Sequence, residues 1–195
     1  MKKKATFLCN NPANVERVFA AGRKEKIAAL TDLYEPVVTQ ERMHEHRERL
    51  AETELVFSTW GMPRLSSDEL DMLPALKAVF YAAGSVKSFA PPLLDRDILL
   101  ISAWGANAVP VAEYTVAQII LANKGFFQNV RSCSSPEGRQ AASRDMAGNF
   151  DEVVALLGAG MIGRNVIELL RPYRLGVVVW DPFLTESQAR ELGVE

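Results

Sequence analysis

The sequence predicts an α/β protein built on parallel β-sheets that are covered by helices. Two observations favour this fold class. The first half of the chain alternates short apolar runs of β-type residues with amphipathic helical stretches, the pattern of a parallel sheet with helices on its faces. In the second half, the apolar run Val153–Leu157 leads directly into the glycine-rich segment Gly158–Gly163, and after a helical stretch a second apolar run ends at Asp181.

The first half is expected to form one domain, residues 1–104. Its strands are expected near Thr6–Cys9, Pro36–Val38, Leu55–Ser58, Lys77–Tyr81 and Ile98–Ser102. Its helices are expected near Val15–Ala21, Lys24–Leu33, Glu41–Ala51 and Ser67–Met72. The last helix has a capping pattern, because Ser66 or Ser67 precedes Glu69. Five strands joined by helices resemble a flavodoxin-like parallel-sheet domain.

The glycine-rich segment has the strand, turn and helix order of a dinucleotide-binding fingerprint. Gly158 permits a tight turn out of the strand, Gly160 lets a pyrophosphate approach the backbone, and Gly163 allows close packing of helix on strand. The helix starting near Met161 directs unpaired N–H groups and its positive dipole end toward the same place. An ordinary strand–turn–helix is the alternative, but it leaves the acid at the end of the next strand unexplained.

Asp181 bears on the choice of dinucleotide. A carboxylate at this position accepts hydrogen bonds from both ribose hydroxyls of an adenosine and repels a 2′-phosphate. Pro182 and Phe183 bring no cation that would offset the repulsion. The sequence therefore predicts NAD rather than NADP, and residues 105–195 are expected to be the start of a Rossmann NAD-binding domain.

A second candidate site follows the strand that ends at Tyr81. Small residues, Ala83, Gly84 and Ser85, come at the carboxyl end of a strand expected to be parallel, where α/β sheets bind ligands. Exposed N–H groups there could hold an anion. A plain strand-ending turn is the alternative interpretation.

A helix is expected to begin at Pro110, which suits a first helical turn. Its apolar residues go nearly all the way round, so we expect burial on several sides, as between two domains or two subunits. From Asn129 to Asn149 the polar composition indicates an exposed connection without an assigned structure.

Composition excludes several classes of partner. The 195 residues carry a formal charge of −2 and are 48% hydrophobic, so there is no electrostatic case for a nucleic acid or a membrane surface. The two cysteines form no disulfide framework and have no metal-ligand spacing, which favours the cytoplasm. His44 and His46 lie in a run of mixed charges that indicates a solvated helix face, so neither is a candidate metal ligand or catalytic residue.

Five segments in this order resemble the D-isomer-specific 2-hydroxyacid dehydrogenase family from about Leu73 onward. They are Leu73–Phe80, Ala83–Ser85, Val111–Ala117, Gly158–Arg164 and Asp181–Phe183. The resemblance implies hydride transfer between NAD and C2 of a 2-hydroxy or 2-keto acid.

The resemblance also assigns roles to residues. Backbone N–H groups of Ala83, Gly84 and Ser85 would bind the substrate carboxylate, and Ser85 would also lie near the cofactor. The amides of Met161 and Ile162 would meet the pyrophosphate, together with Gly158, Gly160 and Gly163, and Asp181 would bind the ribose. The helix starting at Pro110 would pack in a homodimer interface.

The family's reaction uses an arginine, a glutamate and a histidine that come later in its chain. No residue here matches them, so the catalytic set is empty and the chain is expected to be an amino-terminal fragment, inactive alone. A dinucleotide-sensing protein of the corepressor kind and a non-functional split-gene product remain alternatives.

Overall fold

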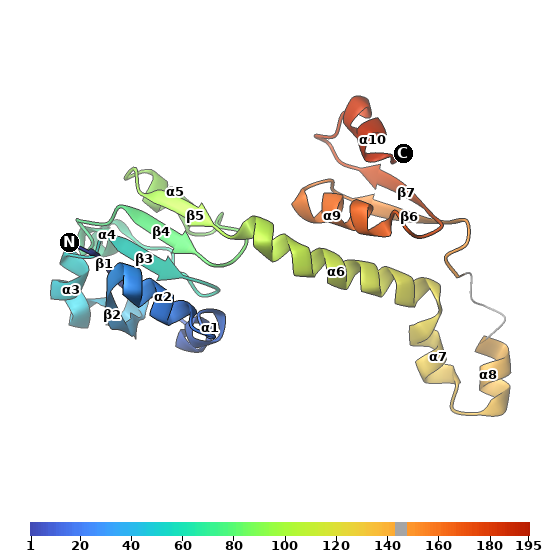
Figure 1. The fold of residues 1–195 in the computed structure, drawn as a ribbon, viewed down its shortest axis with the longest axis horizontal. Coiled ribbons are helices and arrows are strands. Elements are labelled where there is room, and N and C mark those ends of the chain that lie inside the picture. Colours follow the sequence, from blue (N-terminus) through green and yellow to red (C-terminus); the bar gives the residue numbers. More distant parts are fainter. Residues whose placement is uncertain (143–147) are drawn as a thin grey trace. The chain divides into compact units, whose positions relative to one another are not determined.

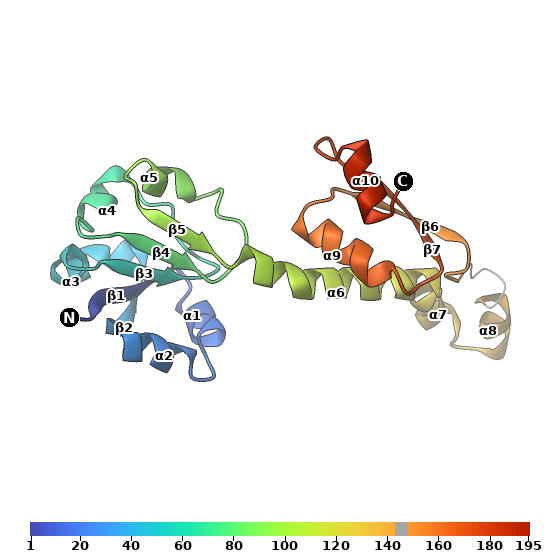
Figure 2. The same ribbon diagram turned by 45° about the horizontal axis from the view of Figure 1, so that its top comes forward.

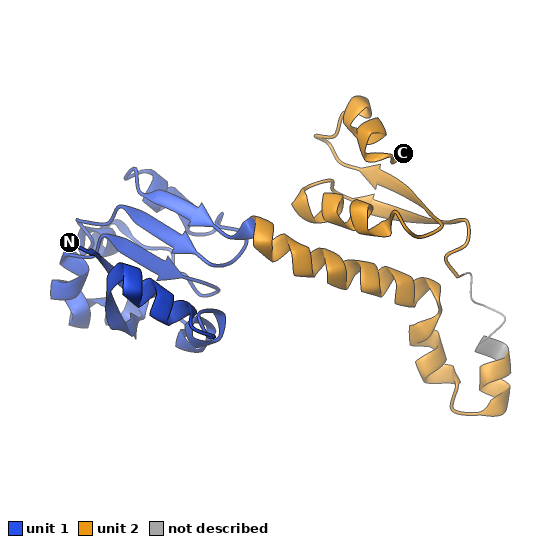
Figure 3. Ribbon diagram, viewed as in Figure 1, with its two compact units in different colours: residues 1–104 blue, residues 105–195 orange. Residues whose placement is uncertain are grey.

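The computed structural model describes residues 1–142 and 148–195. The chain divides into two compact units, residues 1–104 and 105–195, which are treated separately below (Figure 3).

Unit 1 is a five-stranded parallel sheet with helices on both faces (Figure 1). The strand order is β2-β1-β3-β4-β5. In chain order the elements are β1 (Lys3–Leu8), α1 (Pro12–Val18), α2 (Arg23–Leu30), β2 (Thr31–Val38), η1 (Gln40–His46), α3 (Arg47–Ala51), β3 (Leu55–Ser58), α4 (Ser67–Asp71), β4 (Ala78–Tyr81), α5 (Ala90–Leu94) and β5 (Leu99–Ser102). The predicted α/β class and its parallel sheet are confirmed.

Alternation along the strands divides the core of unit 1 into two layers. Phe7 and Phe57 pack with Val15 of α1, whereas their chain neighbours Leu8 and Val56 belong to the other layer. That second layer is completed by Met43 of η1, Leu50 of α3, Leu70 of α4 and Leu93 of α5. Figure 2 shows α1 and α2 on one side of the sheet and α4 and α5 on the other.

The prediction of a helix over Lys24–Leu33 is wrong beyond Leu30. Residues from Thr31 onward form β2, in parallel register with β1 from Lys3. Thr31 is buried, and its hydroxyl donates to the carbonyl of Ile27 at 2.8 Å, at the point where the helix ends. Strand pairing with a distant segment therefore overrides the local helical pattern.

Other helices of unit 1 also bear on the predictions. The stretch expected as one helix over Glu41–Ala51 is split into the 3₁₀ helix η1 and the short helix α3. Helix α5 was not predicted, and its first turn contains Pro91 and Pro92. The capping pattern ahead of α4 is confirmed, because Glu69 N donates to the Ser66 hydroxyl and Ser66 N donates to the Glu69 carboxylate, at 3.3 and 2.7 Å.

Unit 2 contains a two-stranded parallel sheet packed on helices. Its elements are α6 (Trp104–Asn123), α7 (Phe126–Ser132), α8 (Pro136–Ala142), β6 (Glu152–Leu157), α9 (Met161–Leu170), β7 (Leu175–Trp180) and α10 (Glu186–Leu192). One sheet face, with Val154 and Val177, packs against Val116 of α6 and Val166 of α9. The opposite face is exposed, with Trp180 at 67%.

The expected start of a helix at Pro110 is wrong, because Pro110 lies inside α6. A buried stripe of Ala108, Ala112 and Val116 begins ahead of the proline, at the four-residue spacing of one helix face. Packing of that stripe continues the helix through a residue that lacks an N–H. Tyr114 of α6 is 66% exposed, so burial of this helix on several sides, as between two domains or two subunits, stays a prediction.

The connection expected over Asn129–Asn149 contains the end of α7 and all of α8. Residues 143–147 of that connection lie outside the described residues. Over the ranges that are described, none of the helices is long and apolar enough to cross a membrane.

Candidate functional site

The glycine turn of unit 2 joins β6 to α9 beside the end of β7. The two strands pair in parallel up to Leu157 and Trp180, and Gly158 N then donates to Trp180 O at 2.8 Å. The turn and the residue after β7, Asp181, are thereby brought to the same edge of the sheet. This edge is the carboxyl end of both strands, where open α/β sheets bind ligands.

Each glycine of the turn has its own geometry. Gly158 adopts φ +104°, a conformation that L side chains rarely adopt. A Cβ at Gly163 would lie 2.2 Å from the carbonyl oxygen of Gly158, so the approach of helix to strand requires glycine. A Cβ at Gly160 would meet no protein atom within 4 Å. The fold itself therefore does not demand glycine at position 160, and the space beside it is open.

The amino end of α9 faces this turn. Gly160 is the residue before the first helical turn, and Arg164 N donates to Gly160 O at 2.9 Å. The N–H groups of Met161, Ile162 and Gly163 belong to the first turn, where a helix offers no backbone acceptor. Unpaired donors and the positive end of the helix dipole make such a terminus suitable for an anion.

Asp181 contacts the turn directly. Its Oδ2 accepts from Ala159 N at 2.7 Å, and its Oδ1 accepts from Phe183 N at 2.8 Å. The hydrogen bond from Ala159, then that from Phe183, and the charge of Arg164 hold the pKa of the Asp181 carboxyl below its usual value. Asp181 is therefore an ionised acceptor at neutral pH.

The sequence reasoning missed Arg164 and Ala159. Arg164 Nε donates to Ala159 O at 2.9 Å, and its positive charge acts on Asp181. The cation near Asp181 is not among the residues that follow it but is Arg164, which directly follows the last glycine of the motif. The alanine side chain gives no signal, because its backbone groups make the contacts.

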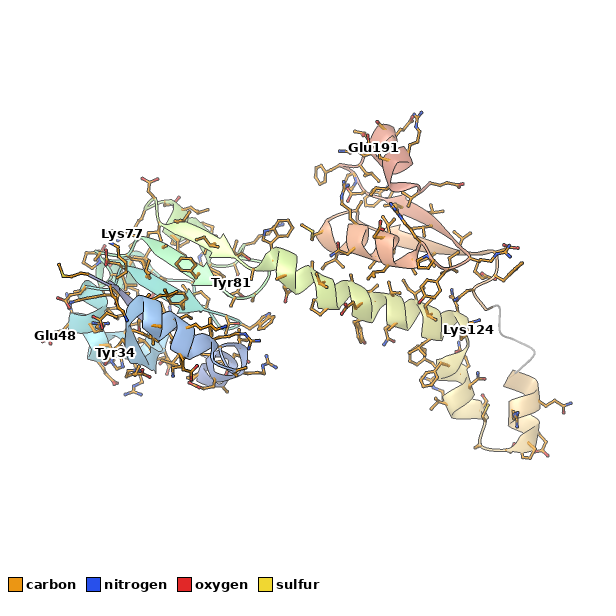
Figure 4. The ribbon with its side chains drawn as sticks, in the orientation of Figure 1. Tyr34, Glu48, Lys77, Tyr81, Lys124 and Glu191 are labelled. Atoms are coloured by element: carbon orange, nitrogen blue, oxygen red, sulfur yellow. The ribbon has the colours of Figure 1, made fainter. Side chains whose placement is uncertain are left out.

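The second candidate site, in unit 1, follows β4. Figure 4 labels Tyr81, the last residue of this strand. Ala83 is buried, Gly84 is half-buried and Ser85 is exposed. The hydroxyl of Ser102, at the end of β5, lies 3.0 Å from Ala83 O and 2.6 Å from Gly84 O. It holds both carbonyls of the loop.

The N–H groups of this loop remain available. Ala82 N donates to Ser58 O at 2.8 Å, but the amides of Gly84 and Ser85 donate to no acceptor in residues 1–142 and 148–195. Thr59, which follows β3, donates from its hydroxyl to Ala82 O at 3.3 Å. Hydrogen bonds to its carbonyls thus hold the loop in place, and its free N–H groups are suited to an anion such as a carboxylate.

Neither histidine belongs to the Ala83 loop or to the glycine turn. Both belong to η1, and His46 Nδ1 is 3.0 Å from the hydroxyl of Tyr34. No group of His, Cys, Asp and Glu that could hold a metal ion occurs in the part of the chain that the structure describes.

A cleft of unit 2 lies away from the glycine turn. It measures about 510 Å³ and lies at the opposite edge of the sheet, between the end of α9, the start of β7 and the residues after α10. Its lining includes Ile167, Leu170 and Leu192, and none of its lining residues belongs to the turn. Charged side chains and unpaired backbone donors converge at the turn instead.

Comparison with known proteins supports the resemblance to D-isomer-specific 2-hydroxyacid dehydrogenases over part of the chain. No family model matches it. Curated relatives include the D-3-phosphoglycerate dehydrogenases of Bacillus subtilis, 27% identical over 134 residues, and of Methanocaldococcus jannaschii, 20% identical over 133. These matches cover 67% and 68% of this chain and 25% of each relative, so the aligned part spans a quarter of their length.

Solved structures share the fold. A phosphoglycerate oxidoreductase from Rhizobium etli matches with a TM-score of 0.70 at 22% identity, over 100% of this chain and 60% of that one. D-mandelate dehydrogenase from Rhodotorula graminis matches with 0.71 at 14%, over 99% and 60%. D-lactate dehydrogenase from Aquifex aeolicus, solved with NAD and lactic acid, matches with 0.61 at 17%, over 98% and 55%.

Proposed function

We propose that this chain supplies the substrate-binding domain and the first part of the NAD-binding domain of an oxidoreductase that acts on 2-hydroxy and 2-keto acids. The observation that carries the proposal is the glycine turn of unit 2, in which Asp181 and the amino end of α9 present an acceptor and several donors at one edge of the sheet. The curated relatives, all named D-3-phosphoglycerate dehydrogenases, support the reaction class.

The residues present fit an NAD molecule. The open space at Gly160 admits a diphosphate close to the backbone, and the amides of Met161 and Ile162 would donate to it. Asp181 would accept from the adenosine ribose. NAD, when bound, supplies a nicotinamide ring that exchanges a hydride with the substrate carbon.

Unit 1 would bind the acid substrate. The free amides of Gly84 and Ser85 would donate to the substrate carboxylate, beside the buried Ala83, while Ser102 keeps the loop carbonyls turned away. The solved relatives are phosphoglycerate, mandelate and lactate enzymes. The proposed substrate is therefore the class of 2-hydroxy and 2-keto acids rather than one acid with a particular side chain.

Residues 1–195 alone are expected to bind without turnover. Reduction of a keto group needs a proton donor at the carbonyl oxygen. In the described ranges neither the Ala83 loop nor the glycine turn carries an imidazole, and His46 is engaged by Tyr34. Binding without turnover would also serve a dinucleotide-sensing protein, which is the alternative function.

Turnover by the longest natural polypeptide that contains these residues separates the two functions. We expect it to oxidise NADH in the presence of at least one member of a panel of 2-keto acids, whereas the isolated 195 residues should not. Absence of any reaction in the longer protein with either NADH or NADPH would contradict the oxidoreductase proposal. Turnover by residues 1–195 would contradict the assignment of no catalytic residue.

We also propose a homodimer formed through α6 and a cytoplasmic location. Val109, Val111 and Tyr114 are exposed on α6, and Phe126 and Phe127 are exposed on α7. Exposed apolar side chains on two consecutive helices are typical of a protein–protein interface. Both cysteines are free, in agreement with a reducing compartment.

A further inference from the structure

Both backbone polar groups of Ala159 are hydrogen-bonded to side chains. Its N–H donates to Asp181 Oδ2 at 2.7 Å, and its carbonyl accepts from Arg164 Nε at 2.9 Å. Ala159 lies between Gly158 and Gly160 and is only 5% exposed. Both partners are charged groups, which form stronger hydrogen bonds than neutral ones.

The three residues belong to different parts of the unit. Ala159 lies in the turn after β6, Arg164 lies in the first turns of α9, and Asp181 follows β7. Asp181 is itself oriented, because its other oxygen accepts from Phe183 N at 2.8 Å. The contacts therefore connect the turn after β6, the first turns of α9 and the residue after β7 through the backbone of one residue, Ala159.

Few other contacts order the backbone of this turn. Glycine has the largest conformational freedom of any residue, so Gly158 and Gly160 on either side of Ala159 raise the entropic cost of ordering the backbone. A Cβ at Gly160 would contact nothing, so packing does not hold that side. Gly158 N donates to Trp180 O and Arg164 N donates to Gly160 O, so the hydrogen bonds at Ala159 hold the residue between these two anchored glycines.

We propose that Asp181 and Arg164 are positioning residues that clamp the backbone of Ala159, one at its N–H and one at its carbonyl, and so preorganise the glycine turn for a diphosphate. Asp181 then has two roles. An ionised carboxylate has about four acceptor positions, and each of its oxygens uses one of them for a backbone N–H. The remaining positions are free for the two ribose hydroxyls, so ribose recognition and order in the turn depend on the same side chain.

Replacement of Asp181 should affect the binding of a ligand without ribose in opposite directions, depending on whether Asp181 clamps the turn or only recognises ribose. Replacing Asp181 removes a negative charge near the diphosphate, which by electrostatics alone would strengthen the binding of inorganic pyrophosphate. If Asp181 orders the turn, the replacement weakens that binding instead. This comparison rests on the proposed function, because it assumes that the turn binds a diphosphate.

The decisive experiment needs no ligand. Amide hydrogen exchange of Ala159 is measured by NMR in residues 1–195 and in D181N, D181A and R164M, with the amides of Val166 and Ile167 inside α9 as references. We expect Ala159 to exchange about tenfold faster or more in D181A and R164M, while the references stay unchanged. D181N can still accept one hydrogen bond through its amide oxygen, so it should fall between wild type and D181A.

Matched controls on α9 are E168Q and R171M, which break the Glu168–Arg171 ion pair at 3.0 Å and make the same charge changes. They should leave Ala159 exchange unaltered. Unchanged exchange of Ala159 in both D181A and R164M would overturn the clamp. If wild type binds neither NAD nor pyrophosphate, the proposed function fails while the exchange data still decide on the clamp.

Discussion

Gly160 precedes α9 and Gly163 lies in its first turn, and the structure gives different reasons for the absence of a side chain at each. At Gly163 a Cβ would collide with the backbone oxygen of Gly158, at 2.2 Å. At Gly160 a Cβ would enter open space, where the proposed diphosphate lies. One position is thus constrained by the fold and the other by the ligand.

Substitution by alanine separates these two constraints. We expect G163A to lower the free energy of unfolding by about 1–3 kcal/mol, because backbone must shift to relieve the overlap. G160A should change stability by less than about 0.5 kcal/mol. It should nevertheless weaken NAD binding, since the added methyl group occupies the path of the diphosphate. Thermal unfolding and calorimetric titration measure the two effects, and a stable G160A variant with wild-type affinity would contradict the placement of the ligand.

At the scale of elements, Glu54 connects the starts of three strands. It precedes β3, and its carboxylate pairs with Lys3 of β1 at 2.6 Å and with Lys77, which precedes β4, at 2.8 Å. Hydrogen bonds from Lys3 and then Lys77 lower the pKa of Glu54 to about 2, from 4.5. Because the pKa is lower in the folded state, the ionised carboxylate stabilises the fold above pH 4.5, and this contribution is lost as the pH falls toward 2.

Replacement of Glu54 by glutamine should therefore flatten the acid limb of the stability curve. In E54Q the free energy of unfolding should depend less on pH between 4.5 and about 2 than in wild type. Glu48 of α3, which forms no ion pair in the described residues, provides the control substitution E48Q. Figure 4 labels Glu48 and also Lys77, one of the two partners of Glu54. Identical pH dependence in E54Q and wild type, from urea titrations at a series of pH values, would show that the two lysines do not stabilise the carboxylate.

The elements that the sequence predicted correctly are those specified by local pattern. Strand β3 has the predicted bounds. The turn after β6 follows from the glycine spacing, because Gly158 has a positive φ, a backbone conformation that glycine adopts readily. The start of β2 was not predicted, because it depends on pairing with β1. The start of α6 was not predicted, because packing of its buried stripe overrides the effect of Pro110. For the same reason the contacts of Ala159 with Asp181 and Arg164 could not be predicted. They exist only once β6, α9 and β7 have come together.

At the scale of the whole molecule, the exposed apolar surface of α6 and α7 leads to the dimer prediction. The variant Y114E places a charge on a side chain that is 66% exposed on α6. A buried, unpaired charge is costly, so we expect the dimer to weaken by about tenfold or more. Sedimentation velocity over a range of concentrations measures the change.

The control for this prediction is L30E in unit 1, a comparable change at a leucine that is 77% exposed on α2. It should leave self-association unchanged. A wild-type chain that stays monomeric at all concentrations would contradict the proposed dimer, and equal effects of Y114E and L30E would show that α6 is not its interface.

Binding of NAD to unit 2 through the glycine turn and Asp181 is measured by calorimetric titration of the 195-residue chain with NAD and with NADP. We predict one NAD per chain, bound at least about tenfold more tightly than NADP, because the ionised Asp181 accepts from ribose hydroxyls and repels a 2′-phosphate. No heat of binding with NAD, or equal affinity for the two dinucleotides, would contradict it.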